Sequence, residues 1–297
     1  MGNPDFDLDL KRTNPPLTPP KEGNSIAGVA GKFPSWEGSG VGSAGLRSLS
    51  RDFRGLKFNP LPGSGIEATN IAKLLGTDAS LRLGADAREA ELKAVVSPRV
   101  LHLATHGFYL PDQELKRTNS PVWSSAFTRP GSPQGGTPND WENPLVRCGI
   151  ALAGANRFAN SELGTPMNRE QARNLELEDG LLTGLEASLL NLQGTELVIL
   201  SACDSGSGEV KIGEGVMSLR RAFRIAGAET VLASHWPVSD KATSHLMTEF
   251  MRRWRSGEPR AKAWREAQLS LLRSKGAKED FSNPYFWASF TLTGQWN

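Results

Sequence analysis

The chain has 297 residues, enough for one large domain or two small ones, with the 22% charged and 38% hydrophobic content of a globular protein. Its net charge of +2 at pH 7 gives no strong field for nucleic acid or a membrane surface, so we expect neither as a partner. The two cysteines, Cys148 and Cys203, are too few for a disulfide framework or a zinc site and indicate a reducing, cytoplasmic compartment. We expect no membrane span, signal peptide, metal or cofactor.

Composition divides the chain into two parts. Residues 1–60 hold a Pro-rich and a Gly/Ser-rich tract, which cannot bury enough apolar surface to offset the loss of backbone entropy. We predict that this segment is poorly ordered and that one folded domain occupies residues 61–297. Residues 111–145 are again rich in Pro, Gly and Ser, and we interpret them as a long surface loop inserted into that domain.

The folded part alternates helical and strand-like patterns, recognised from the spacing of apolar residues and from Gly, Pro and Asp at their ends. In chain order the predicted elements are a helix at 66–75 that ends at Gly76, a helix at 85–96, strands at 100–104 and 149–153, a helix at 181–190, a strand at 197–201, a helix at 213–227, a strand at 229–234, helices at 240–255 and 259–273, and a strand at 286–292. Strands that alternate with helices predict an α/β fold with a mostly parallel sheet covered on both faces.

Two of these strands lead to side chains that can carry chemistry. Apolar runs precede His106 and Gly107 in one segment and Cys203 in another, far along the chain. Parallel strands deliver the residues after them to the carboxyl edge of a sheet, where open α/β folds build their sites. A thiol beside an imidazole is sufficient for covalent attack on a carbonyl, and Gly107 lets a substrate backbone approach. We expect the strand-end position to keep His106 solvated enough to exchange protons near neutral pH.

Each of these residues also has a structural reading. A buried cysteine is commonly a small hydrophobic core residue, and a lone strand-end histidine is more often structural than catalytic. Catalysis by Cys203 is favoured by its place after the apolar run and before a Gly/Ser-rich turn, whose N–H groups can stabilise a thiolate or an oxyanion. His102 lies within its strand, and we expect it to be a hydrogen-bonded residue of the core or the sheet face.

Short motifs in a specific order carry a family resemblance over about residues 60–297. They are LPG at 61–63, HLATHG at 102–107, LAGAN at 152–156, DGLLT at 179–183, LSACDSG at 200–206, GEG at 213–215, AGA at 226–228, WPVSD at 236–240 and YFW at 285–287. With these motifs the chain resembles a CHAT domain, a caspase-like peptidase domain related to separase. We find no periodicity of roughly 34 residues, the signature of the TPR repeats that often precede such domains.

The resemblance implies a caspase-like three-layer α/β/α sandwich with a mostly parallel central sheet, and a cysteine endopeptidase acting on a protein or peptide substrate. By the same resemblance His106 is the general base and acid, Cys203 is the nucleophile, and the N–H groups of Gly107 and Cys203 form the oxyanion hole. In separase, an aspartate in a Trp-x-Val-x-Asp segment is associated with binding a basic P1 side chain. Asp240 matches that aspartate, and a carboxylate there would favour Arg or Lys.

Four residues around the dyad have two readings each. Asp240 either forms the floor of that pocket or caps the helix that starts near residue 241, and the two roles are compatible. Asp204 either lines the cleft or is a solvated loop acid, and Trp236 either walls the groove or is a packed aromatic. His235 stands where the family usually has an apolar residue such as leucine, so it either alters a subsite or is merely exposed.

Two other functions stay open. A catalytically silent CHAT domain would serve as a scaffold or a regulatory module for protein interactions. Alternatively, the peptidase is inactive until a regulatory protein partner binds or the loop at 111–145 is cleaved. Basic residues in or near that loop would suit a basic-P1 enzyme that cuts itself; they are Lys116, Arg117, Arg129 and Arg147. The first sheet strand of the family is not evident, and residues 55–60 are its best candidate.

Overall fold

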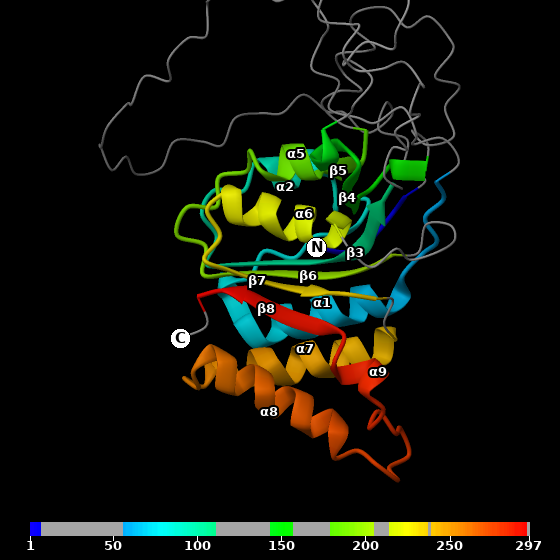
Figure 1. The fold of residues 1–297 in the computed structure, drawn as a ribbon, viewed down its shortest axis with the longest axis vertical. Helices are drawn as coiled ribbons and strands as arrows, with labels where there is room; N and C mark the ends of the chain where they lie inside the picture. The colour runs from blue at the N-terminus through cyan, green and yellow to red at the C-terminus, as the bar shows by residue number, and fades with distance from the viewer. Residues whose placement is uncertain (7–55, 111–142, 157–178, 205–213, 237–238, 296–297) are drawn as a thin grey trace, which may run out of the picture.

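The computed structural model describes most of the segments in which we predict elements. The described residues are 1–6, 56–110, 143–156, 179–204, 214–236 and 239–295. Within them one sheet of eight strands carries helices on both faces (Figure 1). Residues 111–142 of the predicted loop and residues 7–55 of the segment 1–60 lie outside these ranges. No helix in the described part has both the length and the apolar character needed to cross a bilayer.

Four strands form the centre and one edge of the sheet. β3 (Val100–Tyr109), β6 (Leu197–Asp204) and β7 (Thr230–Ser234) run parallel, and β8 (Phe290–Gly294) pairs antiparallel with β7. The apolar residues 197–200 of β6 are buried on both sides of the sheet. This is the pattern expected of a parallel strand that lies between two helical layers.

Four short strands complete the sheet beyond β3. β1 (Gly2–Pro4) lies parallel between β3 and β2 (Leu83–Gly84). β4 (Cys148–Ala151) pairs antiparallel with the last residues of β3, and β5 (Leu181–Thr183) pairs antiparallel with β4. The strand order is β2-β1-β3-β6-β7-β8, with β4 and β5 continuing from β3. The predicted α/β class is confirmed.

One face of the sheet is covered by α1 (Pro62–Leu75) and α7 (Asp240–Arg255), and α8 (Arg260–Leu272) packs on α7 (Figure 1). Leu197 and Ile199 of β6 belong to the hydrophobic core on this face. The predicted helices in these three regions are confirmed with small changes at their ends. α1 ends at Gly76, whose φ of 73° a residue with a side chain rarely adopts.

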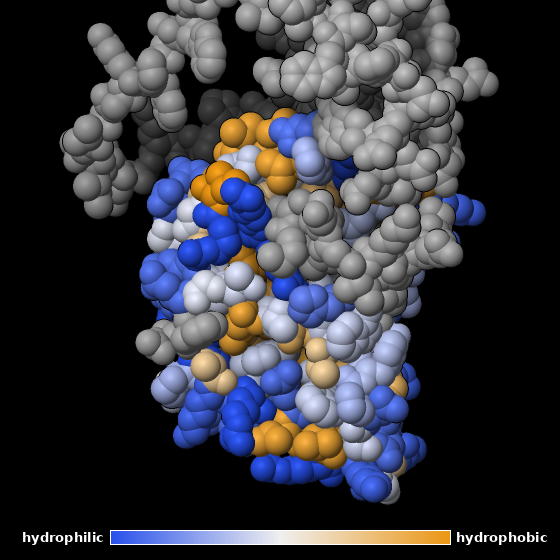
Figure 2. Space-filling model, viewed as in Figure 1, coloured by the Kyte–Doolittle hydropathy of each residue, from blue (hydrophilic) through white to orange (hydrophobic). Residues whose placement is uncertain are grey.

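The opposite face is covered by α2 (Glu89–Lys93), α5 (Gly184–Ala187) and α6 (Glu214–Ile225) (Figure 1). Val198 and Leu200 of β6 belong to this second core, because successive residues of a strand point to opposite faces. The remaining short elements are the 3-10 turns at Gly76–Asp78 and Pro144–Val146 and the helix α9 (Pro284–Trp287). On the face shown in Figure 2, hydrophilic residues surround small apolar patches.

Three predicted elements need correction. The helix expected at 85–96 is limited to α2, and the strand expected at 286–292 begins only at Phe290, after α9. The helix expected at 181–190 contains β5 followed by α5. Leu182 of β5 pairs with Ile150 of β4 and is fully buried. An apolar run of this kind fits a helical pattern equally well, and the tertiary pairing decides between the two.

The domain boundary expected at residue 61 is also wrong, since residues 1–6 and 56–60 belong to the fold. Gly2 pairs with Ala104 of β3, so β1 is the first described strand, and the described residues 56–60 of the candidate segment do not form one. Phe6 and Phe58 are 3% and 1% exposed and pack in a small core beside the carboxyl end of β3. A strand of three residues is too short to leave a periodic pattern in the sequence.

Candidate active site

His106 lies inside β3, because the strand continues to Tyr109. It is 1% exposed, so the expectation of a solvated histidine at the rim of the sheet is wrong. The rings of Phe6 and Phe58 lie beside the imidazole, with centroids 5.3 and 5.8 Å away. Both phenylalanines come from segments that the sequence placed outside the folded domain, and their packing explains the burial.

A backbone carbonyl fixes the orientation of the imidazole. The Nε2 atom of His106 lies 2.6 Å from the carbonyl oxygen of Asn59. Because a carbonyl can only accept, Nε2 carries a proton and donates it. In the neutral ring the lone pair is then on Nδ1. This tautomer assigns Nδ1 as the nitrogen that can take a proton from a thiol.

Cys203 is the register partner of His106. β3 and β6 are paired from Val100 opposite Leu197 onward, and this ladder sets His106 opposite Cys203. Adjacent strands lie about 4.8 Å apart, so the two residues occupy neighbouring positions in the sheet. β6 runs to Asp204, so Cys203 lies within the strand, whereas the sequence indicated a place after it. The side chains of Cys203 and Asp204 lie outside the described part of the structure.

Gly107 also lies within β3. It pairs with Ile150 of β4 on one side and with Asp204 of β6 on the other. The two residues predicted to supply the oxyanion hole, Gly107 and Cys203, therefore belong to strands, whereas the sequence indicated turns. Their role as donors stays a prediction.

His102 is a structural residue, as predicted. Its Nε2 atom lies 2.7 Å from Oε1 of Glu67 in α1, and the side chains are 9% and 2% exposed. This pair links β3 to the helix that covers it. A buried polar group needs such a partner to avoid the cost of desolvation.

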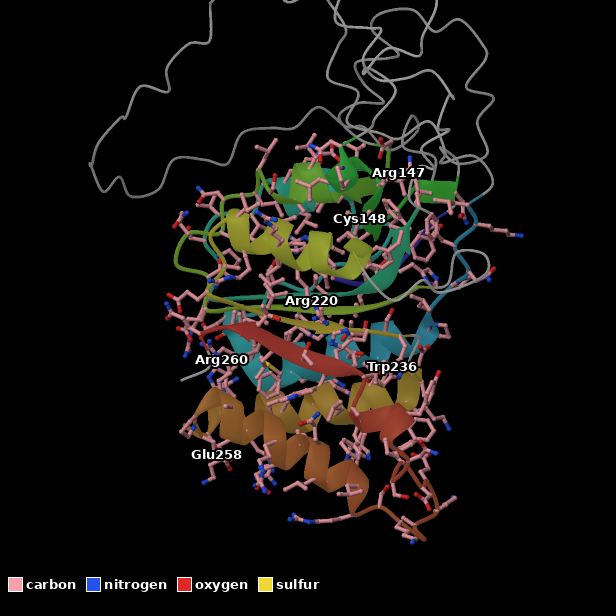
Figure 3. The ribbon with its side chains drawn as sticks, in the orientation of Figure 1. Arg147, Cys148, Arg220, Trp236, Glu258 and Arg260 are labelled. Carbon is pink, nitrogen blue, oxygen red and sulfur yellow. The ribbon has the colours of Figure 1, made fainter. Side chains whose placement is uncertain are left out.

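Trp236 and Asp240 follow β7 on the chain. The indole Nε1 of Trp236 donates to the carbonyl of Tyr285 at 3.1 Å, which supports the reading of a packed aromatic (Figure 3). Asp240 is the first residue of α7, and Ser239 occupies the N-cap position, so the reading of Asp240 as the cap is wrong. Asp240 packs against Gly63 in the first turn of α1, where an added Cβ would clash with the Cβ of Asp240.

A family model described as the CHAT domain matches residues 1–295. The chain belongs to the CHAT domain family. Tetratricopeptide repeat protein 28 of Mus musculus is 27% identical over 238 residues, which are 80% of this chain and 9% of that protein. The Homo sapiens protein of the same name is 36% identical over 119 residues, which are 40% of this chain and 4% of that protein. The chain thus spans less than a tenth of the length of these relatives.

His235 of this CHAT domain interacts with α6 and β8. Its Nε2 atom lies 2.8 Å from Oγ1 of Thr291 and 3.3 Å from the guanidinium of Arg220, which is 4% exposed. Burial, followed by the charge of Arg220, lowers the pKa of His235. Arginine only donates, so Nε2 of His235 is an acceptor. His235 is therefore half-buried in a hydrogen-bonded contact. Neither the predicted subsite role nor the predicted exposure to solvent included this contact.

Little in the sequence identifies the residues that surround His106. Asn59 contributes a backbone carbonyl, which any residue type could supply, so no sequence signal marks it. Asn156 is 3% exposed and bonds both backbone groups of Phe58. The LAGAN motif at 152–156 contains this asparagine and is the one signal that could have pointed to it.

One groove in the described part of this CHAT domain lies away from His106. It has a volume of about 590 Å³ and is lined by residues from the start of β3, including Val100, and from α1 and α7, including Ile71 and Trp254. The sites of open α/β sheets lie at the carboxyl ends of strands, and this is the end where His106 and Cys203 are. No group of three or more metal-ligating side chains occurs among the described residues.

Proposed function

We propose that this CHAT domain is a cysteine endopeptidase in which His106 and Cys203 act as a dyad. The observation that carries the proposal is the register of β3 and β6, which makes the two residues neighbours. The bond from Nε2 of His106 to the Asn59 carbonyl supports it, because that bond leaves the lone pair on Nδ1. Helices on both faces of the sheet agree with the caspase-like three-layer sandwich that the family resemblance implies.

The reaction follows from these groups. Nδ1 of His106 takes the proton of the Cys203 thiol, and the thiolate attacks the peptide carbonyl to give a tetrahedral oxyanion. As the C–N bond breaks, the imidazolium returns its proton to the leaving amine, and a thioacyl-enzyme forms. Water then attacks the thioester with His106 again as base, which releases the acid and restores the thiol. The N–H groups of Gly107 and Cys203 are the proposed donors to the oxyanion.

Substrate selection is assigned to Trp236 and Asp240, which follow β7, and to Asp204 at the end of β6. Asp240 is proposed to bind a basic P1 side chain through a charge-assisted hydrogen bond. Trp236 and Asp204 are proposed to line the substrate groove. The substrate is a protein or peptide, and the proposed compartment is the cytoplasm.

The enclosure of His106 supports a regulated enzyme. At 1% exposure the imidazole has little access to a substrate carbonyl in this conformation. We propose that binding of a regulatory protein partner, or cleavage within 111–145, opens the site. The competing function is a silent CHAT domain that acts as a scaffold, and the same burial is the observation that favours it.

Hydrolysis of fluorogenic peptides that end in Arg, Lys, Leu or Asp tests the proposal, before and after limited proteolysis of the full chain. Cys203→Ala and His106→Ala are expected to abolish turnover. Cys148→Ala is the matched cysteine control, because burial raises the pKa of the Cys148 thiol to about 12 and keeps it inert. His245→Ala, at an exposed position on α7, is the histidine control.

The outcomes separate the functions. Turnover that persists in Cys203→Ala would refute the proposed dyad. The absence of turnover under every condition would refute the peptidase and favour the scaffold function. A preference for Arg over Leu that disappears in Asp240→Asn supports the pocket assignment. The same preference in both proteins would refute it.

A further inference from the structure

Asn156 connects two segments that enclose the imidazole of His106. Its side-chain Oδ1 accepts from the N–H of Phe58 at 2.7 Å, and its Nδ2 donates to the carbonyl of Phe58 at 2.9 Å. The reverse orientation of the amide would oppose donor to donor, so these two bonds fix it. The backbone N–H of Asn156 donates to the carbonyl of Phe6 at 2.9 Å. Asn156 therefore binds the backbone of both phenylalanines that flank His106.

Within residues 56–60, the side chain of Asn156 bonds the backbone at Phe58. The segment forms neither helix nor strand, so no ladder holds it. The amide of Asn156 bonds the N–H and the C=O of Phe58, as a neighbouring strand would. Asn59, the next residue, directs its carbonyl to Nε2 of His106 at 2.6 Å. The bonds that Asn156 makes thus hold the residue next to that carbonyl, in a segment whose side chains Leu56 and Phe58 also pack in the core.

We propose that Asn156 is a positioning residue for His106. It holds residues 58 and 59 so that the Asn59 carbonyl keeps the imidazole proton on Nε2 and the lone pair on Nδ1. Without a fixed carbonyl, a neutral imidazole can carry its proton on either nitrogen. The Nδ1–H form has no lone pair to offer a neighbouring thiol. The inference depends on the proposed function only for the role of the imidazole as a base.

Nitrogen-15 NMR of the histidine rings tests the proposal without any need for activity. All samples are the full chain with Cys203→Ala. A sample that also carries His106→Gln identifies the resonance of His106. The comparison is between the chain with Asn156 and the chain with Asn156→Leu. We expect one Nε2–H tautomer with Asn156 and a substantial Nδ1–H population in Asn156→Leu. Leu271→Ala, in the core under α8 and remote from His106, controls for lost stability. If Asn156→Leu does not fold, Asn156→Asp is measured instead. Its carboxylate cannot donate to the Phe58 carbonyl, so the same shift in the tautomer is expected.

The proposal also predicts a kinetic effect in chains with Cys203 intact. Loss of a positioned base lowers kcat by about 100-fold, and we expect KM to change little. An unchanged Nε2–H tautomer in the Asn156 variants would overturn the inference, even if the wild-type chain hydrolyses peptides. A changed tautomer without any wild-type hydrolysis would keep the positioning role and overturn the peptidase.

Discussion

Replacing Glu89 by glutamine is predicted to flatten the pH dependence of stability. Glu89 in α2 is 1% exposed. Its Oε1 atom pairs with the ammonium of Lys93 at 2.5 Å, and its Oε2 atom accepts a hydrogen bond from the N–H of Gly180 at 3.2 Å. Burial, and then the negative charge of Glu186, raise the pKa of Glu89 from its usual 4.5 to about 8. The pKa of Asp179 is raised as well, by burial and then by Glu89. Lys93 pairs with both Glu89 and Glu186, and its charge also acts on Asp179.

The sign and size of the effect follow from this pKa. Because the carboxyl holds its proton more tightly in the folded chain, its contribution is fully present below pH 4.5 and is lost as the pH rises through about 8. Each pKa unit corresponds to about 1.4 kcal/mol, so a shift of this size gives a ceiling of about 5 kcal/mol across the window. The value of about 8 already includes the attraction of Lys93 for the ionised carboxylate, which lowers the pKa.

Urea denaturation of the full chain at pH 5, 6.5 and 8 measures the effect. The free energy of unfolding of the wild type should fall over this range by more than that of Glu89→Gln. Glu91→Gln is the matched control, since Glu91 lies on the same helix but is partly exposed and pairs with Arg82. Equal slopes for the wild type and Glu89→Gln would refute the reasoning, because they would mean that Glu89 ionises alike in the folded and unfolded chains.

Three further changes test the packing. Gly63→Ala brings a Cβ into collision with that of Asp240 and should destabilise the fold by about 1–3 kcal/mol in urea denaturation; an unchanged midpoint would contradict the close contact. Arg220→Met should raise the pKa of His235 in an NMR titration, because the guanidinium charge helps to lower it, and an unaltered pKa would leave burial as the only cause. Thr183→Ala removes a capping box and should cost about 1 kcal/mol in the same urea assay, whereas no loss would mean that water replaces the cap.

Part of the fold was predictable because its signals are local. The apolar residues at the end of α1 and its terminal glycine indicate that helix wherever it packs, although Ile66, which fitted the same pattern, is exposed. The apolar runs before His106 and Cys203 indicate β3 and β6. The pattern at 181–190 was ambiguous, because β5 is defined by its pairing with β4. Pairing energy comes from a distant strand, so a local pattern carries no record of it.

The sequence by itself determined the chemical equipment of this protein: a histidine and a cysteine at corresponding places on two strands, within the motifs of a CHAT domain. Only the tertiary structure decided how the histidine is held. Its Nε2 bonds a carbonyl 47 residues away, and the asparagine that fixes this carbonyl reaches across 98 residues. Backbone groups are the same in every residue, so the role of the Asn59 carbonyl leaves no trace in residue type. The same packing buried His106, whereas its position after an apolar run had indicated exposure to solvent.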